Sequence, residues 1–464
     1  MTTLPEGTDS SVLNLYEKRE KIYVRRIEGL YQNIRLYTGW PLLLGYFLSP
    51  WFMIDGRQAI LFDLPERKFH ILWVTFWPQD FVLLAWSLMI AAFLLFFTTN
   101  LLGRVWCGYT CPQTVWTAIF MWAEQTAEGE RHQRMRLDQQ PWNFEKVWRR
   151  AAKHGMWLGF AFLTGLTFVS YFYGMRDILV DAANLTLPTV AAFWICFFTA
   201  TTYINAGWMR EQVCTYMCPY ARFQSAMFDR DTLIVSYDAE RGDPRGSRKR
   251  GEPREATGKG DCIDCNMCVQ VCPTGIDIRD GLQYQCINCA LCVDACNSIM
   301  DKMDYERGLV RYTTLNQLDG QKWTWKRPKL IGYAIAVTIM LSAVSYMLLS
   351  RVPLELDVLR SRGQLYQEVP GGLIQNIYTL KVINMDKSAY DYDLTVSGLP
   401  EYRIVPSGPI SVPAGEIGEL SVNLLVNPEL LTQVNTPIVF EVQTTDGKYS
   451  AVSKSTYIGP VPVK

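Results

Sequence analysis

The sequence predicts a multi-domain protein: an α-helical membrane bundle of five transmembrane helices, an inserted cysteine-rich α+β domain and a C-terminal all-β sandwich. Three observations predict this fold class. Five stretches, each close to the roughly 20 residues that span a bilayer, carry no charged residue. Eight of the 13 cysteines fall within 262–296. The stretch 354–464 has no cysteine and contains segments that alternate apolar with polar residues.

Composition excludes several classes of function. The 45 basic residues balance 45 acidic ones, so the net charge is zero. Nucleic acid is therefore not expected as a partner, because phosphate binding needs a basic excess. The sequence has no G-x-G-x-x-G ahead of a helix, no Walker loop and no C-x-x-C-H motif. Sites for nicotinamide, flavin, ATP or covalent haem are not supported.

The uncharged stretches are interpreted as membrane helices, and the Lys and Arg distribution predicts their orientation. The predicted spans are Leu36–Ile54, which contains two prolines, Phe81–Gly103, Gly155–Met175, Thr189–Trp208 and Leu330–Ser350. The segment 104–154 carries eight Lys and Arg residues, whereas 176–188 carries one. Because basic loops stay in the cytoplasm, 104–154 and the N-terminus are predicted to be cytoplasmic. Five spans then place the C-terminus in the periplasm.

These features predict a division of the chain into six parts. They are a cytoplasmic N-terminal segment (1–35), a membrane domain with spans one to four (36–237), a polar linker (238–260), a cytoplasmic cysteine-rich domain (261–328, core 261–305), the fifth transmembrane helix (329–351) and a periplasmic β domain (354–464).

The eight clustered cysteines form two runs with the spacing of two-cluster ferredoxins. Both runs read C-x2-C-x2-C-x3-C; Pro273 follows the first, and Asn297 follows the second. In such ferredoxins the fourth cysteine of each run ligates the other cluster. The predicted ligands are Cys262, Cys265, Cys268 and Cys296 for one [4Fe-4S] cluster, and Cys286, Cys289, Cys292 and Cys272 for the other. Zinc is the alternative, but it typically uses two distant pairs of ligands rather than two consecutive runs of four.

Two further cysteine pairs stand at the ends of the second and fourth predicted spans. Each reads Cys-x3-Cys-Pro, with Cys107 and Cys111 in the first and Cys214 and Cys218 in the second, at a constant offset of 107 residues. The offset predicts a duplicated two-span unit. Cysteines four apart share a helix face, and the following proline breaks the helix or starts a new one.

Three roles are open for these four cysteines. Two thiolates per pair suit Cu(I), and four suit a shared soft-metal or redox site. The second role is that of buried structural cysteines. The third is a disulfide, although a permanent bridge is disfavoured in a reducing cytoplasm. Cys196 stands alone inside a span and is interpreted as a packing residue.

The C-terminal stretch predicts a small β-sandwich. Residues 378–383 and 438–442 alternate as half-buried strands do, and Gly, Pro and Asp residues supply turns between such segments. An immunoglobulin-like module of about 100 residues without a disulfide fits this pattern.

These motifs resemble the cytochrome c oxidase accessory protein family CcoG, also called FixG or RdxA. The stretch WCGYTCPQTVW over 106–116 is similar to its first hallmark, and EQVCTYMCPYARFQSAMFD over 211–229 is similar to its second. The ferredoxin runs match as well, with GIDIRDG over 275–281 between them. The resemblance covers nearly the whole chain.

The resemblance implies a bacterial inner-membrane protein that reduces Cu(II) to Cu(I) during assembly of a cbb3-type cytochrome oxidase. The residues implied to bind and reduce copper, as catalytic residues, are Cys107, Cys111, Cys214 and Cys218. The eight ferredoxin cysteines would hold the two clusters that supply electrons. The implied partners are the lipid bilayer, copper chaperones or a copper transporter, oxidase assembly factors and an electron donor of unknown identity. A homodimer is left open.

Two alternative functions fit the same motifs. One is a quinol-linked membrane polyferredoxin, because related proteins with Cys-x3-Cys-Pro pairs are thought to oxidise quinol. The other is a non-enzymatic assembly scaffold whose clusters only sense the redox state. Reduction of Cu(II) by the purified protein distinguishes a cupric reductase from both.

Overall fold

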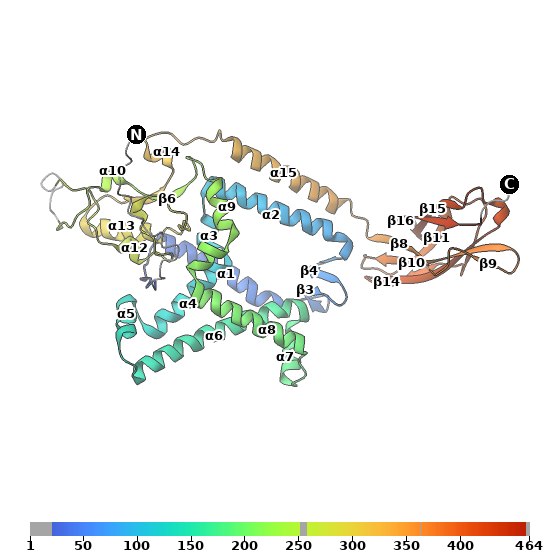
Figure 1. The fold of residues 1–464 in the computed structure, drawn as a ribbon, viewed down its shortest axis with the longest axis horizontal. Coiled ribbons are helices and arrows are strands. Elements are labelled where there is room, and N and C mark those ends of the chain that lie inside the picture. Colours follow the sequence, from blue (N-terminus) through green and yellow to red (C-terminus); the bar gives the residue numbers. More distant parts are fainter. Residues whose placement is uncertain (1–20, 251–257, 362, 461–464) are drawn as a thin grey trace, which may run out of the picture. The chain divides into compact units, whose positions relative to one another are not determined.

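The computed structural model describes residues 21–250, 258–361 and 363–460 (Figure 1). The chain divides into two compact units, 1–342 and 343–464, which are described separately. The first unit contains the apolar helices and the cysteine-rich module. The second contains the end of the last apolar helix and the β domain.

Four helical segments in the described residues are long and apolar enough to cross a membrane. They are α2 (Phe81–Leu102), which follows the 3-10 turn Pro78–Asp80, α6 (Phe144–Tyr173), α8 (Thr189–Thr202), which continues as the π-helix η3 (Tyr203–Met209), and α15 (Pro328–Leu349). Helices α6 and α8 pack side by side. The Tyr333 ring of α15 contacts Phe93 and Phe96 of α2.

The prediction of five apolar spans is therefore wrong for the first of them. Residues 36–54 do not form one helix, because helix α1 covers Leu30–Leu48 and is followed by the 3-10 turn Ser49–Trp51 and strand β1 (Met53–Ile54). The first turns of α1 contain Gln32, Asn33 and Arg35. These polar side chains, together with the early end of the helix, reduce the mean hydropathy of α1, and it is not among the four candidates.

Helix α1 nevertheless runs from the cysteine-rich module to the C-terminal half of α6. At its start, the backbone N–H of Gln32 donates to Asp294 of the module, 2.8 Å away. Near its end, Tyr46 Oη donates to the carbonyl of Thr164 over 2.8 Å, and Tyr171 Oη donates to the carbonyl of Tyr46 over 2.7 Å. The chain thus passes between these two places before it enters α2.

The duplicated unit predicted from the Cys-x3-Cys-Pro offset is visible in the backbone. Helix α3 (Val105–Tyr109) is followed by α4 (Pro112–Glu128), and the π-helix η4 (Val213–Met217) is followed by α9 (Pro219–Met227). Just before each motif one residue has a positive φ: Gly103 at 63° and Arg210 at 42°. These two residues are also 107 positions apart, so each apolar helix ends in the same way before its cysteine pair.

Shorter elements connect the apolar helices. They are β2 (Arg57–Gln58), β3 (Ile60–Asp63), β4 (Lys68–Ile71), β5 (Val74–Phe76), α5 (Arg131–Gln139) and α7 (Met175–Ala183). Strands β3, β4 and β5 form an antiparallel sheet, and β1 pairs with β2. The side chain of Gln58 donates to the carbonyl of Ser170 in α6, so this connection packs against the end of α6.

The cysteine-rich module is built on an antiparallel strand pair with short helices. Its elements are β6 (Ile234–Tyr237), α10 (Ala239–Gly242), α12 (Met267–Gln270), the 3-10 turn η5 (Ile278–Asp280), α13 (Leu291–Met303), β7 (Val310–Thr313) and α14 (Leu315–Leu318). Strand β6 pairs with β7. The described part of 238–260, expected as a polar linker, packs on the module: Arg241 forms an ion pair with buried Asp261, and Arg248 is itself buried.

The β domain consists of two sheets. One has the strand order β12-β14-β10-β8, with β9 paired to β10, and the other has the order β13-β11-β15-β16. The strands are β8 (Leu354–Arg360), β9 (Gln367–Val369), β10 (Leu373–Asn384), β11 (Tyr390–Ser397), β12 (Arg403–Val405), β13 (Ile410–Val412), β14 (Ile417–Val426), β15 (Asn435–Thr444) and β16 (Ser450–Ile458). Tyr378, Phe440 and Tyr457 are fully buried in its core. The predicted all-β sandwich is confirmed.

Candidate metal centre

Two cavities in the module are lined by cysteines of both runs. The first is lined by Cys272 of the first run, by Cys286, Cys289 and Cys292 of the second, and by Cys268. The second is lined by Cys262, Cys265 and Cys268 of the first run and by Cys296 of the second. The structure therefore brings each predicted set of four cysteines to one cavity. The fourth cysteine of each run lies with the opposite run, and Cys268 borders both cavities.

The two runs share a backbone conformation that their spacing alone does not reveal. The residues on either side of each second cysteine have positive φ: Asp264 at 55°, Asn266 at 55°, Asn288 at 53° and Ala290 at 57°. Non-glycine residues rarely adopt this conformation. Left-handed residues next to right-handed ones form backbone nests, which bind anions and occur at many iron–sulfur sites. The repeated conformation therefore suits a negatively charged cluster at each run.

Seven of the eight cluster cysteines are buried or partly buried, and Cys265 is exposed. Burial raises the pKa of Cys268 to about 11 and the pKa values of Cys286 and Cys296 to about 12. It also raises the pKa values of Cys289 and Cys292. A buried thiolate without a cation is costly, so these side chains need bound metal to remain deprotonated. The cysteine-only donor set, the cavities and the burial together fit two [4Fe-4S] clusters.

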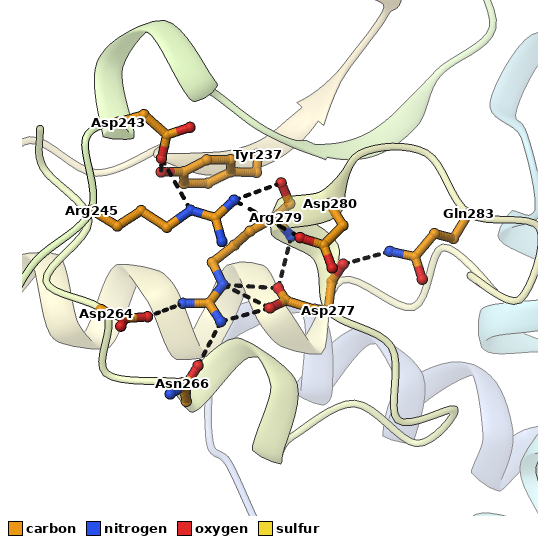
Figure 2. A network of polar contacts seen from close by, with 9 residues as sticks. All are labelled: Tyr237, Asp243, Arg245, Asp264, Asn266, Asp277, Arg279, Asp280 and Gln283. Atoms are coloured by element: carbon orange, nitrogen blue, oxygen red, sulfur yellow. Dashed lines mark hydrogen bonds and ion pairs between the residues drawn. The ribbon is translucent and has the colours of Figure 1, made fainter. Parts of the chain in front are cut away.

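Arg279 fixes the loop of the first run (Figure 2). Its guanidinium donates to Asp277 and also reaches Asp264 and Asn266, the two residues that flank Cys265, over 2.5 Å each. Hydrogen bonding to Arg279 holds the pKa of Asp277 below its usual range. The Arg279 side chain is only 7% exposed. One buried arginine thus connects the turn after the first run to the left-handed residues within it.

The two Cys-x3-Cys-Pro motifs meet where the repeats contact each other. Cys107 Sγ donates to Gln224 Oε1 of α9 over 3.2 Å, and α9 is the helix that follows Cys218. From the other side, Gln113 of α4 donates to the carbonyl of Arg210, 3.2 Å away, just before the second motif. Contacts on both sides of the second motif therefore hold it against the first.

The four thiols of these motifs lie close enough to influence one another. Burial, followed by the nearby Cys111, Cys107 and Cys218, raises the pKa of Cys214 to about 12. Burial and then Cys111 raise the pKa of Cys107 to about 11. All four side chains are partly buried and form no disulfide. Like charges at short range disfavour several thiolates at once, so binding of a soft cation would favour their joint deprotonation.

Cys111 and Cys218 occupy equivalent places at the beginnings of helices. Each is the N-cap of a helix whose first residue is proline, α4 and α9 respectively. Burial raises the pKa of Cys111, but the backbone N–H groups of Gln113 and Thr114 act in the opposite direction. A helix N-terminus favours negative charge, and low-pKa cysteines are often found there. One thiol of each pair thus stands at the positive end of a helix dipole.

The first motif packs directly on the second cysteine run. A Cβ atom on Gly108 would lie 2.7 Å from the carbonyl oxygen of Ile287 and 3.0 Å from Cys289 Cα, so glycine permits this approach. Cys107 packs against the apolar cluster that contains Ile287, Cys289 and Leu291. Tyr109 Oη and Tyr312 Oη lie 3.2 Å apart. Cys107 of the paired thiols therefore adjoins the wall of the first cavity.

No three His, Cys, Asp or Glu side chains in the described ranges are arranged around one single-ion position. The ferredoxin cysteines likewise do not converge on a single-ion position; they line the two cavities. Cys196, interpreted from the sequence as a packing residue, is exposed on α8, so that interpretation is wrong. Its side chain lies on the surface of an apolar helix and takes no part in either cysteine group.

Family models match three parts of the chain. A 4Fe-4S dicluster domain matches residues 209–315, a 4Fe-4S binding domain matches 84–125, and the immunoglobulin-like fold at the C-terminus of FixG matches 344–460. The nitrogen fixation protein FixG of Rhizobium meliloti is 39% identical over 423 residues, which cover 83% of this chain and 81% of that protein. The chain belongs to the FixG/RdxA family.

Further relatives agree with this assignment. Protein RdxB of Cereibacter sphaeroides is 38% identical over 88% of this chain and 89% of its own length, and protein RdxA of the same organism is 38% identical over 83% and 84%. The crystal structure of a FixG-related protein from Vibrio parahaemolyticus, matched over its full length and 24% of this chain, is 30% identical with a TM-score of 0.23. This FixG-family chain is a membrane iron–sulfur electron-transfer protein with an immunoglobulin-like C-terminal domain.

Sequence reasoning missed four features of the FixG-family site. They are the left-handed residues of both runs, Arg279 between Asp264 and Asp277, Gln224 beside Cys107, and the buried Arg104. Arg279 lies in the GIDIRDG stretch, which is a usable signal. Arg104 has only the sequence signature of a basic residue that flanks a span, and nothing in its immediate sequence distinguishes it from one that faces lipid headgroups.

Proposed function

We propose that this chain is a membrane-bound oxidoreductase that passes single electrons to Cu(II) and releases Cu(I) for assembly of a cbb3-type cytochrome oxidase. The packing of Cys107 and Gly108 against Ile287 and Cys289 supports this proposal most directly. It puts a group of paired thiols, suited to Cu(I), next to a cavity suited to an iron–sulfur cluster. Copper chaperones or a copper transporter would exchange copper with the thiols.

The ligands proposed for the clusters follow the two cavities. Cys262, Cys265, Cys268 and Cys296 would hold one [4Fe-4S] cluster, and Cys272, Cys286, Cys289 and Cys292 would hold the other. Such clusters supply one-electron chemistry, commonly at low potential. Cys265 is the exposed member of the first set. The first set is therefore the better placed to accept electrons from a separate donor, and the second adjoins the paired thiols.

The paired thiols would act on copper by stabilising Cu(I) relative to Cu(II). Cu(II) gains one electron and becomes Cu(I), while the protein loses one electron; no bond breaks and no proton is transferred. Soft thiolate ligands prefer Cu(I). Cys111 and Cys218 stand at helix N-termini, where the helix dipole favours negative charge, and the hydrogen bond to Gln224 orients Cys107.

Replacing the four paired cysteines, Cys107, Cys111, Cys214 and Cys218, by alanine should reduce the rate of Cu(II) reduction at least roughly a hundredfold. That corresponds to the loss of about 2.7 kcal/mol of transition-state stabilisation. The protein is reduced, freed of excess reductant under anaerobic conditions and mixed with a Cu(II) salt, and Cu(I) is measured with a chromogenic chelator. Iron content should stay unchanged, because these residues lie outside both cavities.

The C196A variant is the control, because Cys196 is exposed on α8 and distant from both cysteine groups in sequence. It should reduce Cu(II) at the unaltered rate. Unchanged copper binding and reduction in the fourfold variant would contradict the proposal. The proposal would also be contradicted if the unaltered protein holds more iron than two clusters require and the fourfold variant loses that excess. The four cysteines would then hold a further cluster.

We further propose that the cysteine-rich module is cytoplasmic and that the β domain is periplasmic. Residues 21–25 of the basic N-terminal segment contact α5 and the module: Lys21 pairs with Asp138, and the N–H of Arg25 donates to Gln270. The basic segments therefore gather at one end of the helices, as the positive-inside rule requires for a cytoplasmic face.

Tags at the two ends of the chain should therefore lie on opposite sides of the membrane. Protease added to spheroplasts should remove a C-terminal tag and leave an N-terminal tag intact, because only the C-terminal domain is exposed to the outside. Inverted vesicles should give the reverse pattern. If both tags are cut in the same preparation, the two ends lie on the same side of the membrane and the proposed orientation of the two domains is wrong.

A further inference from the structure

Arg104 is a buried arginine without a carboxylate partner. It follows α2 and is only 3% exposed. Its Nη1 donates to the carbonyl of Tyr284 and, at 3.4 Å, to that of Cys286; its Nη2 donates to the carbonyl of Ala221. Its Nε has no hydrogen-bond partner, and within the described residues no Asp or Glu forms an ion pair with it. Every partner of this cation is therefore an uncharged carbonyl.

The same side chain connects the two cysteine groups. Tyr284 and Cys286 belong to the beginning of the second ferredoxin run, whereas Ala221 lies in α9, one turn after Cys218. Burial lowers the pKa of Arg104. The charges of four nearby thiols raise it: Cys107, Cys286, Cys214 and Cys218. Arg104 therefore lies between a predicted cluster ligand and the paired thiols.

A buried guanidinium with neutral surroundings is unfavourable. The effective cost of burying an unpaired ion is several kcal/mol, and carbonyl groups offset only a part of it. Neutral thiols add no negative charge. Metal-bound thiolates do, and a cluster held by four thiolates carries a net negative charge that grows by one on reduction. The structure thus contains a cation whose counter-charge is present only when the cysteines hold metal.

We propose that Arg104 is the shared counter-charge of the two cysteine groups, and that it raises the reduction potential of the cluster held by Cys286. A nearby positive charge stabilises the reduced, more negative state of a cluster more than its oxidised state. Arg104 touches no reacting atom and is a positioning residue. The effect of Arg104 on Cu(I) binding by the paired thiols rests on the proposed function. The effect of Arg104 on the cluster potential does not depend on it.

Redox titration of the R104Q variant tests this role. In the purified protein, followed by electron paramagnetic resonance, one of the two clusters should become harder to reduce. At a fixed potential its reduced-to-oxidised ratio should fall at least tenfold, a shift of about 59 mV for one electron. The other cluster should titrate as before. R104K keeps the charge and should retain most of the original potential. This readout does not involve copper, so it is separate from a failure of the proposed reductase activity.

R134Q is the matched control, because Arg134 is equally buried but pairs with Glu124 and donates to Val24 rather than to the ferredoxin runs. It should lower thermal stability without shifting either potential. If R104Q does not assemble its clusters but R104K does, the requirement for charge is supported. If R104Q titrates like the unaltered protein, if R104K shifts as far as R104Q, or if both variants fail to assemble clusters, the counter-charge role is overturned.

Discussion

Replacing Cys292 by alanine should remove one [4Fe-4S] cluster and leave the other in place. Cys292 lines the first cavity with Cys272, Cys286 and Cys289, and it does not line the second. Loss of this ligand leaves three thiolates for the cluster, because the other cysteine that lines the cavity, Cys268, is assigned to the other cluster. Iron should fall from roughly eight to roughly four atoms per chain, as expected for one cubane out of two. Iron analysis and low-temperature electron paramagnetic resonance of the reduced protein measure this directly.

The crosswise arrangement of the ligands makes the prediction more specific. C272A should lose the same cluster as C292A, although Cys272 belongs to the first run, and C296A should lose the same cluster as C262A. Cu(II) reduction should decrease at least roughly a hundredfold in C292A, because the lost cluster adjoins the paired thiols. The exposed Cys196 again provides the control. A C272A spectrum that matches C262A, with the second run intact, would show that each run holds its own cluster.

The grouping of the eight ferredoxin cysteines around two cavities could be predicted from the sequence, because it depends on short local spacing. Two runs of four cysteines determine which thiols can converge, and the cavities follow that pattern. The duplication was predictable for the same reason, since a constant offset preserves backbone features such as the positive φ at Gly103 and Arg210. The alternating segments of the β domain likewise carry their own signal, because strand burial has a period of two.

The remaining features depend on contacts between distant segments. Helix α1 is not among the four candidate spans, and its packing against α6 rests on the Tyr46 contacts, which connect segments far apart in sequence. Ala290 in a left-handed conformation has no sequence signal, because alanine rarely adopts it. The partners of Arg104 are more than 100 residues away in sequence. Hydropathy and spacing describe neighbours along the chain and cannot report which buried charges lack a partner.

A second consequence of such distant contacts is a buried ion group beside the second motif. Glu124 of α4 is 1% exposed and pairs with Arg134 of α5 at 3.3 Å and with Arg210 at 2.8 Å. Burial raises the pKa of Glu124, but Arg210 and Arg134 together bring it below its ordinary value. Arg210 has a positive φ and precedes Cys214 by four residues. One carboxylate therefore holds the backbone turn at which the second motif begins.

Replacing Glu124 by glutamine should destabilise the protein by about 3–5 kcal/mol, the usual cost of breaking a buried ion pair by removing one partner. The amide fills the same space but leaves Arg134 and Arg210 as uncompensated buried cations. The stabilisation that the carboxylate provides should also depend on pH. Because the folded-state pKa of Glu124 is lowered, its contribution is present above the unfolded-state pKa and is lost as the pH falls through the folded-state value.

E145Q is the matched control for this measurement. Glu145 forms an i,i+4 pair with Arg149 at 3.0 Å, but its side chain is 58% exposed, and exposed pairs contribute about 0–1 kcal/mol. Thermal unfolding in detergent should separate the two variants clearly at neutral pH and bring E124Q closer to the unaltered protein at acidic pH. Equal midpoints for E124Q and E145Q at neutral pH would contradict this account. Since Arg210 holds the turn before Cys214, E124Q should also weaken Cu(I) binding by the paired thiols, whereas E145Q should leave it unchanged.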